Sequence, residues 1–105
     1  MLRMIALAGF AAALAGTAVA QEMTIKAVSS FAEGTKDSLG FEALIAEINK
    51  RGAGKIKIQY LGGAPKVMSP FEVVKNLKDG VVDMANANSA FFTNVMPEAD
   101  AFKLA

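Results

Sequence analysis

The chain has 105 residues and a nearly balanced charge, with 11 Lys or Arg and 10 Asp or Glu, which argues against nucleic acid as a partner because phosphate binding relies on clustered basic side chains. It contains no Cys and no His, so thiolate and imidazole metal sites, Ser-His-Asp catalysis and Cys-His catalysis are excluded within it. We therefore expect no metal and no cofactor.

The first 20 residues are predicted to be a cleavable export signal. Arg3 provides a positive start, residues 5–14 are apolar, and residues 18–20 have the small-x-small pattern of a cleavage site. A membrane anchor is the alternative, but the uncharged stretch falls short of the roughly 20 strongly apolar residues that a span needs. Cleavage directly after this pattern would leave 10 basic and 10 acidic residues.

The mature chain begins with a predicted strand and helix. Residues 23–29 are predicted as a strand, because Ile25 and Val28 are β-branched and turn-forming residues follow. A helix is expected from about residues 35–38 to Gly52. Its apolar side chains recur at i, i+3, i+4 and i+7 and form one stripe for packing on a sheet: Phe41, Leu44, Ile45 and Ile48.

Residues 55–60 alternate between lysine or glutamine and apolar side chains, which predicts a half-buried strand with Ile56, Ile58 and Tyr60 on one face. The lysines on the opposite face suit an edge of the sheet, where charge discourages pairing with other chains. Residues 62–65 (Gly-Gly-Ala-Pro) break the alternation, so a loop is expected up to Ser69.

A second helix is predicted to start at Ser69-Pro70, where Glu72 completes a capping box, and to end at Gly80. Its expected buried side consists of Phe71, Val74 and Leu77. Residues 81–88 are predicted as a third strand with an apolar start and a polar tip, and residues 90–96 as a short helix that ends at Pro97. Residues 98–105 are left without a packing partner.

This order predicts an α/β fold, a βαβαβ unit with a parallel sheet. Crossovers between parallel strands are right-handed in nearly all cases, so two such helices permit either the strand order 2-1-3 or a simple progression. We expect 2-1-3, because a crevice then opens between the carboxyl ends of strands one and three, where ligands bind in such sheets.

Three loops would border this crevice, at residues 29–34, 61–65 and 86–89. The amino end of the first helix also faces it, and its free amides near residues 35–37 favour an anionic ligand group. Within the loops, the candidate ligand-binding residues are Ser30, Phe31, Glu33, Gly63, Asn86, Asn88 and Ser89.

Each candidate has a structural alternative. Asn86 and Asn88 could bind a ligand through their amides, but Asn is also common where strands turn into helices. Phe31 could close over an apolar part of a ligand or anchor its loop. Glu33 could contact a hydroxyl or amine or remain solvated, and the serines could simply form turns. Gly63 lies in a Gly-Gly pair that lacks the Lys-Ser/Thr ending of a P-loop, so turn geometry explains it.

Three segments resemble a known family: the strand at residues 24–27, the helix-to-strand passage at residues 48–58 and the run at residues 77–84, followed by a Pro97-Glu98 exit. Over about residues 23–104 the chain resembles the amino-terminal part of the solute-binding proteins of tripartite ATP-independent periplasmic (TRAP) transporters. This resemblance implies a periplasmic receptor that captures a small organic anion and delivers it to the membrane subunits of the transporter, without catalysis.

The chain departs from the family pattern in two respects. Family members commonly have an acidic residue after Leu-Gly in the loop that follows the second strand, whereas this chain has Gly63-Ala64-Pro65-Lys66 after Leu61-Gly62. They are also much longer, with two lobes joined by hinge strands, and their carboxylate-clamping arginine belongs to the absent part. We therefore expect residues 21–105 to be an incomplete amino-terminal lobe of a bilobed periplasmic-binding-protein fold.

Other functions remain open. The receptor of an ATP-driven importer shares the lobe architecture, and only the second lobe or the neighbouring genes would separate it. An exported enzyme would have to use carboxylates such as Glu98 and Asp100, which lie in a flank without a predicted pocket. A small exported interaction module would leave the edge of the third strand uncovered, although parallel sheets are normally buried.

Overall fold

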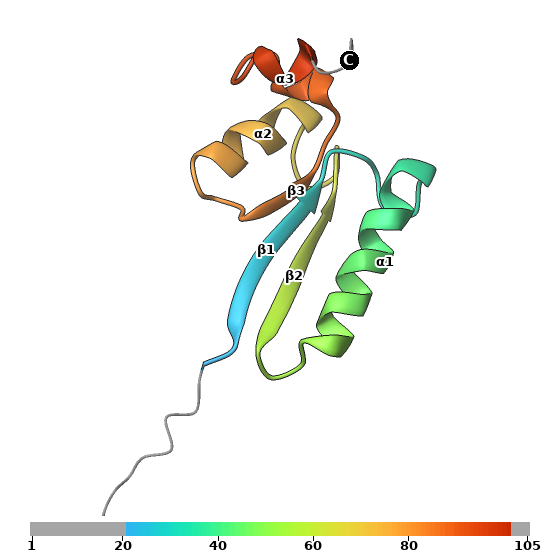
Figure 1. Cartoon of the computed structure of the whole chain (residues 1–105). Coiled ribbons are helices and arrows are strands. Elements are labelled where there is room, and N and C mark those ends of the chain that lie inside the picture. Colours follow the sequence, from blue (N-terminus) through green and yellow to red (C-terminus); the bar gives the residue numbers. More distant parts are fainter. Residues whose placement is uncertain (1–20, 102–105) are drawn as a thin grey trace, which may run out of the picture.

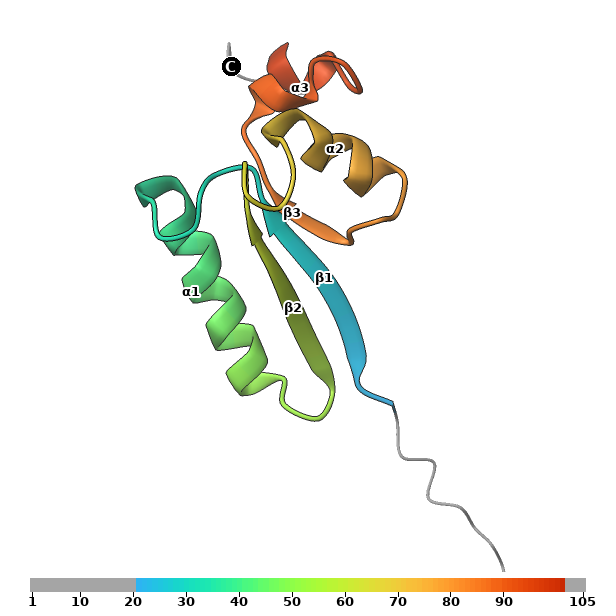
Figure 2. The same ribbon diagram turned by 180° about the vertical axis from the view of Figure 1, so that it is seen from behind.

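Three parallel strands form one sheet in the order β2-β1-β3, as predicted. The computed structural model describes residues 21–101, and the expected export signal lies outside them. The two long helices lie on opposite sides of the sheet (Figures 1 and 2). The elements are β1 Met23–Ser29, α1 Lys36–Arg51, β2 Ile56–Gly63, α2 Pro70–Lys78, β3 Met84–Asn86, the 3-10 helix η1 Ser89–Phe92, and α3 Glu98–Ala101.

The central strand β1 supplies a core residue to each face of the sheet. Ala27 packs with Ile45 of α1 and Ile58 of β2, while its neighbour Val28 packs with Val73 of α2 and with Val82. Ala27 and Val28 are both 0% exposed. Because successive strand residues point to opposite faces, this pair divides the core into one layer under each helix.

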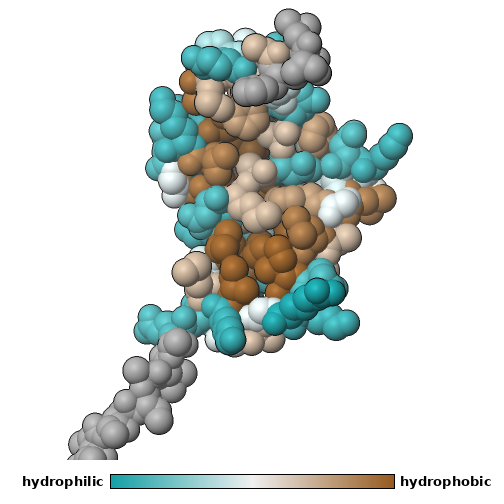
Figure 3. All heavy atoms as spheres, in the orientation of Figure 1, coloured by the Kyte–Doolittle hydropathy of each residue, from teal (hydrophilic) through white to brown (hydrophobic). Residues whose placement is uncertain are grey.

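Helix α1 begins after Thr35 and ends at Gly52, close to the predicted bounds. Its predicted apolar stripe is correct for Ile45, which is buried, and for Phe41 and Ile48, which are half-buried. Leu44, the fourth residue of the stripe, is 49% exposed. Leu44 lines an open hollow of about 400 Å³ with Ile48 and Ile56. The periodicity therefore identifies the helix face correctly but overestimates how far the sheet extends beneath it. Figure 3 shows a broad apolar area on the face presented in Figure 1.

Strand β2 lies at an edge of the sheet, as its alternation predicted, with Ile58 buried and Lys57 exposed. Its outer side is occupied by a side chain. The Asn49 amide of α1 donates to the Ile58 carbonyl at 3.0 Å and accepts from the Ile58 N–H at 2.6 Å. Both backbone groups of Ile58 are thereby satisfied without another strand.

Helix α2 begins at the predicted residue, and the Glu72 carboxylate accepts a hydrogen bond from the Ser69 N–H at 2.9 Å. The prediction that Phe71 is buried was wrong, since it is 60% exposed. The buried side consists of Val73 and Val74, with Leu77 half-buried. Phe71 instead packs edge-on against Phe91 at the margin of the helix.

Two elements differ in length from the prediction. Strand β2 continues through Gly63, because Gly63 pairs in register with Ser29. Strand β3 is shorter than residues 81–88 at both ends. At its start, the Asp83 carboxylate accepts the Lys26 N–H at 2.9 Å in place of a strand carbonyl, and after its end Asn88 caps η1. The expected short helix at residues 90–96 is the 3-10 helix η1.

The prediction that the segment after Pro97 has no packing partner was wrong, because α3 lies against η1. At the start of α3, the Ala99 N–H donates to the Met96 carbonyl at 3.0 Å. Residues 102–105 are not described. Between residues 21 and 101, no helix combines the length and apolar character required to cross a membrane.

Candidate functional site

The carboxyl ends of all three strands meet around Ser29. Its register partners are Gly63 in β2 and Asn86 in β3. Backbone hydrogen bonds continue past the strands, from the Ser30 N–H to the Asn86 carbonyl at 2.8 Å and from the Ala64 N–H to the Ser29 carbonyl at 2.9 Å. The predicted convergence of these loops on one edge of the sheet is therefore confirmed.

The polar side chains at this edge hold the edge together. The Asn86 amide donates to Ser29 Oγ at 3.2 Å and to the Asp37 carbonyl at 2.9 Å. Ser29 Oγ also accepts from the Phe31 N–H at 3.1 Å. Ser30 is 3% exposed and its hydroxyl lies 3.4 Å from the Pro70 carbonyl. Asn86 thus links β3 to α1, and Ser30 links β1 to α2.

Gly63 allows the end of β2 to approach the loop after β1 more closely than any side chain would permit. A Cβ atom there would overlap the Phe31 carbonyl oxygen and would lie 2.9 Å from the Glu33 nitrogen and 3.1 Å from the Ala32 carbonyl carbon. All three are backbone atoms, which cannot rotate away. This close approach requires a glycine at position 63. The Gly-Gly pair in the sequence indicates a turn but does not reveal this requirement.

A hollow of about 260 Å³ opens beside Gly63, between the loop after β1 and the loop after β2. The expected crevice lay instead between the carboxyl ends of the first and third strands, where Asn86 bonds to Ser29 and to the Asp37 carbonyl. It is lined by Ala32, Glu33, Gly63, Ala64, Pro65 and Lys66, and the Ala64-Pro65 peptide bond is cis. Glu33 and Gly63 are the predicted site residues that line it. Lys66 was not predicted, although it is the one cation in the loop between Leu61 and Ser69.

The other predicted residues lie outside this hollow. Asn88 accepts the Ala90 N–H at 3.0 Å and caps η1, and the Ser89 hydroxyl lies 3.4 Å from the Asn88 side chain. The Phe31 ring packs against Phe91, with centroids 5.9 Å apart. These residues organise the third loop and its contact with the first.

A polar cluster joins α1 to β2, and sequence analysis did not single it out. The Glu42 carboxylate accepts from the Gly34 N–H at 3.1 Å and from the Ser38 hydroxyl at 3.0 Å, and it lies 3.4 Å from the Tyr60 hydroxyl. Burial raises the pKa of the Tyr60 phenol above 10.0, and the charges of Glu42 and Glu33 raise it further, while the Ser38 hydrogen bond opposes the increase. The i, i+4 spacing of Ser38 and Glu42 was the available signal.

The amino end of α1 has fewer free amides than predicted. The Thr35 N–H donates to the Ala32 carbonyl at 3.3 Å, and the preceding Gly34 N–H is taken by Glu42. Loop closure therefore uses the Thr35 donor, one of the three that were expected to favour an anion.

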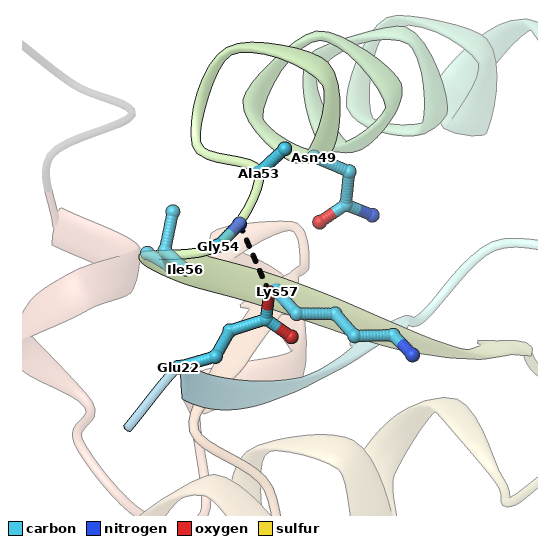
Figure 4. Close-up of a pocket in the computed structure, with 6 residues that line it drawn as sticks. All are labelled: Glu22, Asn49, Ala53, Gly54, Ile56 and Lys57. Carbon is cyan, nitrogen blue, oxygen red and sulfur yellow. Dashed lines mark hydrogen bonds between the residues drawn. The ribbon is translucent and has the colours of Figure 1, made fainter. Parts of the chain in front are cut away.

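A second hollow, of about 320 Å³, lies at the opposite end of β1 and β2. Two of its polar side chains are used internally: Figure 4 shows the Glu22 carboxylate turned toward the Gly54 amide, at 3.1 Å, and Asn49 is bound to Ile58. These hydrogen bonds stabilise the turn between α1 and β2.

The described residues contain no group of three or more acidic side chains placed to hold a metal ion. No protein-family model matches the sequence.

Proposed function

We propose that this chain captures a small organic anion as the amino-terminal lobe of a periplasmic solute receptor of the TRAP type, for delivery to the membrane subunits of the transporter. The observation that supports this most strongly is the meeting of three parallel strand ends at Ser29, Gly63 and Asn86, with a hollow beside them. Ligands of open parallel sheets bind outside the carboxyl ends of the strands.

The hydrogen bonds at the edge suit a rigid wall of a binding site. Ser29 and Ser30 are buried, and Asn86 bonds to two different elements. Such a wall costs little ordering when a ligand arrives. In the proposed receptor, a second lobe would close over this wall by hinge motion and bury the ligand between them.

Lys66 is the group in the hollow that would attract an anion. Lys66 lines the space, and the ion pairs found among residues 21–101, Glu47 with Arg51 and Lys75 with Asp79, do not involve it. TRAP receptors commonly carry an acidic residue in this loop, so Lys66 reverses the charge that the resemblance would lead one to expect there. Affinity would come from charge attraction and from shape, with no covalent step.

The same wall would serve the receptor of an ATP-driven importer, so the proposal of a solute receptor does not depend on the transporter class. An enzymatic function has no comparable support. Glu98 and Asp100, the carboxylates considered for it, lie in and around α3 and do not line the hollow at the strand ends.

The experiment compares pentanoate with pentanamide as probes of the full chain, using NMR chemical-shift titration. Pentanoate should shift the resonances of residues 32–33 and 63–66 in a saturable manner, and the uncharged amide should not. Lys66→Gln should abolish the difference between the probes, whereas Lys55→Gln, a matched change at the opposite end of β2, should preserve it. Equal shifts from both probes, or a pentanoate effect that Lys66→Gln does not reduce, would refute anion capture at this edge.

A further inference from the structure

The hollow at the strand ends carries one charge of each sign. Glu33 and Lys66 both line it, Glu33 from the loop after β1 and Lys66 from the loop after β2. They are not joined to each other: the ion pairs among residues 21–101 lie elsewhere, on α1 and α2. Each group is exposed and remains available to a ligand.

The Glu33 carboxylate lies close to Gly62, at the end of β2. One of its oxygens would lie 2.5 Å from a Cβ atom at Gly62, so the absence of a side chain at Gly62 provides its place. Gly62 has a φ of +119°, which disfavours any other residue there. The charge of Glu33 also acts on Tyr60. The carboxylate therefore lies against the end of β2, in space that a side chain at Gly62 would fill.

We propose that the ligand is an amino acid or a related zwitterion, with its carboxylate at Lys66 and its ammonium group at Glu33. This inference rests on the proposed function and specifies its ligand. A simple carboxylate would satisfy Lys66 but would bring a second negative charge beside Glu33. A zwitterion matches both charges, and hydrogen bonds between charged groups are stronger than those to a neutral hydroxyl.

The size of the hollow agrees with such a ligand. Its volume of about 260 Å³ corresponds to roughly eight or nine water molecules, taking about 30 Å³ for each. A small amino acid fits this space. The hollow at the other end of the sheet also has a carboxylate and a lysine, Glu22 and Lys57, but Glu22 is already bound to the Gly54 amide.

The test uses three probes with one carbon skeleton: L-norvaline, L-2-hydroxypentanoate and pentanoate, titrated against the full chain by NMR. L-norvaline should bind about threefold to fivefold more tightly than pentanoate, a range typical of one exposed charge pair. Glu33→Gln should remove this advantage without weakening pentanoate. Glu98→Gln makes the same charge change on α3, outside the hollow, and should leave the advantage intact.

The outcomes separate this inference from the proposed function. If pentanoate binds as tightly as L-norvaline, or if the hydroxy acid equals L-norvaline, the zwitterion is refuted while anion capture stands. If L-norvaline keeps its advantage in Glu33→Gln, the assigned role of Glu33 is refuted. If none of the three probes binds at the strand ends, both proposals fail together.

Discussion

The close approach at Gly63 makes a prediction in which the same substitution has opposite effects at two positions. Gly63→Ala would press a methyl group into the backbone of residues 31–33. Gly40→Ala adds the same methyl group inside α1, where nothing lies within 4 Å of it. The two variants therefore separate steric conflict from the general effect of replacing glycine with alanine.

The expected magnitudes follow from these surroundings. Overpacking costs about 1–3 kcal/mol, and relief by moving the loop would weaken the hydrogen bond from the Ala64 N–H to the Ser29 carbonyl, for about another 1 kcal/mol. Gly63→Ala should thus lower the free energy of unfolding by roughly 2–4 kcal/mol. Gly40→Ala should raise it by about 0.5–1 kcal/mol, because glycine is entropically costly within a helix.

Urea unfolding followed by far-ultraviolet circular dichroism measures both effects. For a chain of this size, with a urea dependence of about 1 kcal/mol per molar, the Gly63→Ala midpoint should fall by roughly 2 M or more, and the Gly40→Ala midpoint should rise. A Gly63→Ala midpoint equal to that of the unchanged protein would refute the argument from close approach. A loss of stability in Gly40→Ala would show that the conflict at Gly63 is not specific.

Three further predictions concern single contacts. Glu72→Ala should lower the free energy of unfolding by about 0.5–1 kcal/mol through loss of the cap on Ser69, and an unchanged urea midpoint would contradict it. Tyr60 is the only tyrosine, so phenolate absorbance should titrate at higher pH in the folded chain than in urea, where its pKa is near 10.0. Its raised pKa stabilises the fold below about pH 10 and ceases to do so above the folded value; coincident titrations would refute this. Asn49→Ala should cost about 1–3 kcal/mol by leaving Ile58 unpaired, and it should increase self-association in size-exclusion chromatography, whereas unaltered elution and stability would count against the role of this side chain.

Local chemistry was enough to predict the elements. The bounds of β1 and the start of α2 at Ser69-Pro70 follow from β-branched residues, turn formers and a helix cap, all of which act over a few residues. Leu44 and Phe71 were misplaced because periodicity identifies a helix face but not the extent of the partner surface.

The errors at the strand ends have a different origin. Gly63 was interpreted as a breaker because its reason for being glycine lies in a backbone segment some 30 positions earlier. Strand β3 is short because Asp83 bonds to Lys26, again a distant contact. Lys66 was overlooked as a lining residue for the same reason: its neighbour in the hollow, Glu33, is close only in the fold.

The occupied outer side of β2 has a consequence for self-assembly. Asn49 satisfies both backbone groups of Ile58 on that side, so β2 does not offer another copy an unbroken row of donors and acceptors. An open-ended ribbon of copies requires two pairing edges per molecule. This one asparagine would thus hinder the growth of such a fibre.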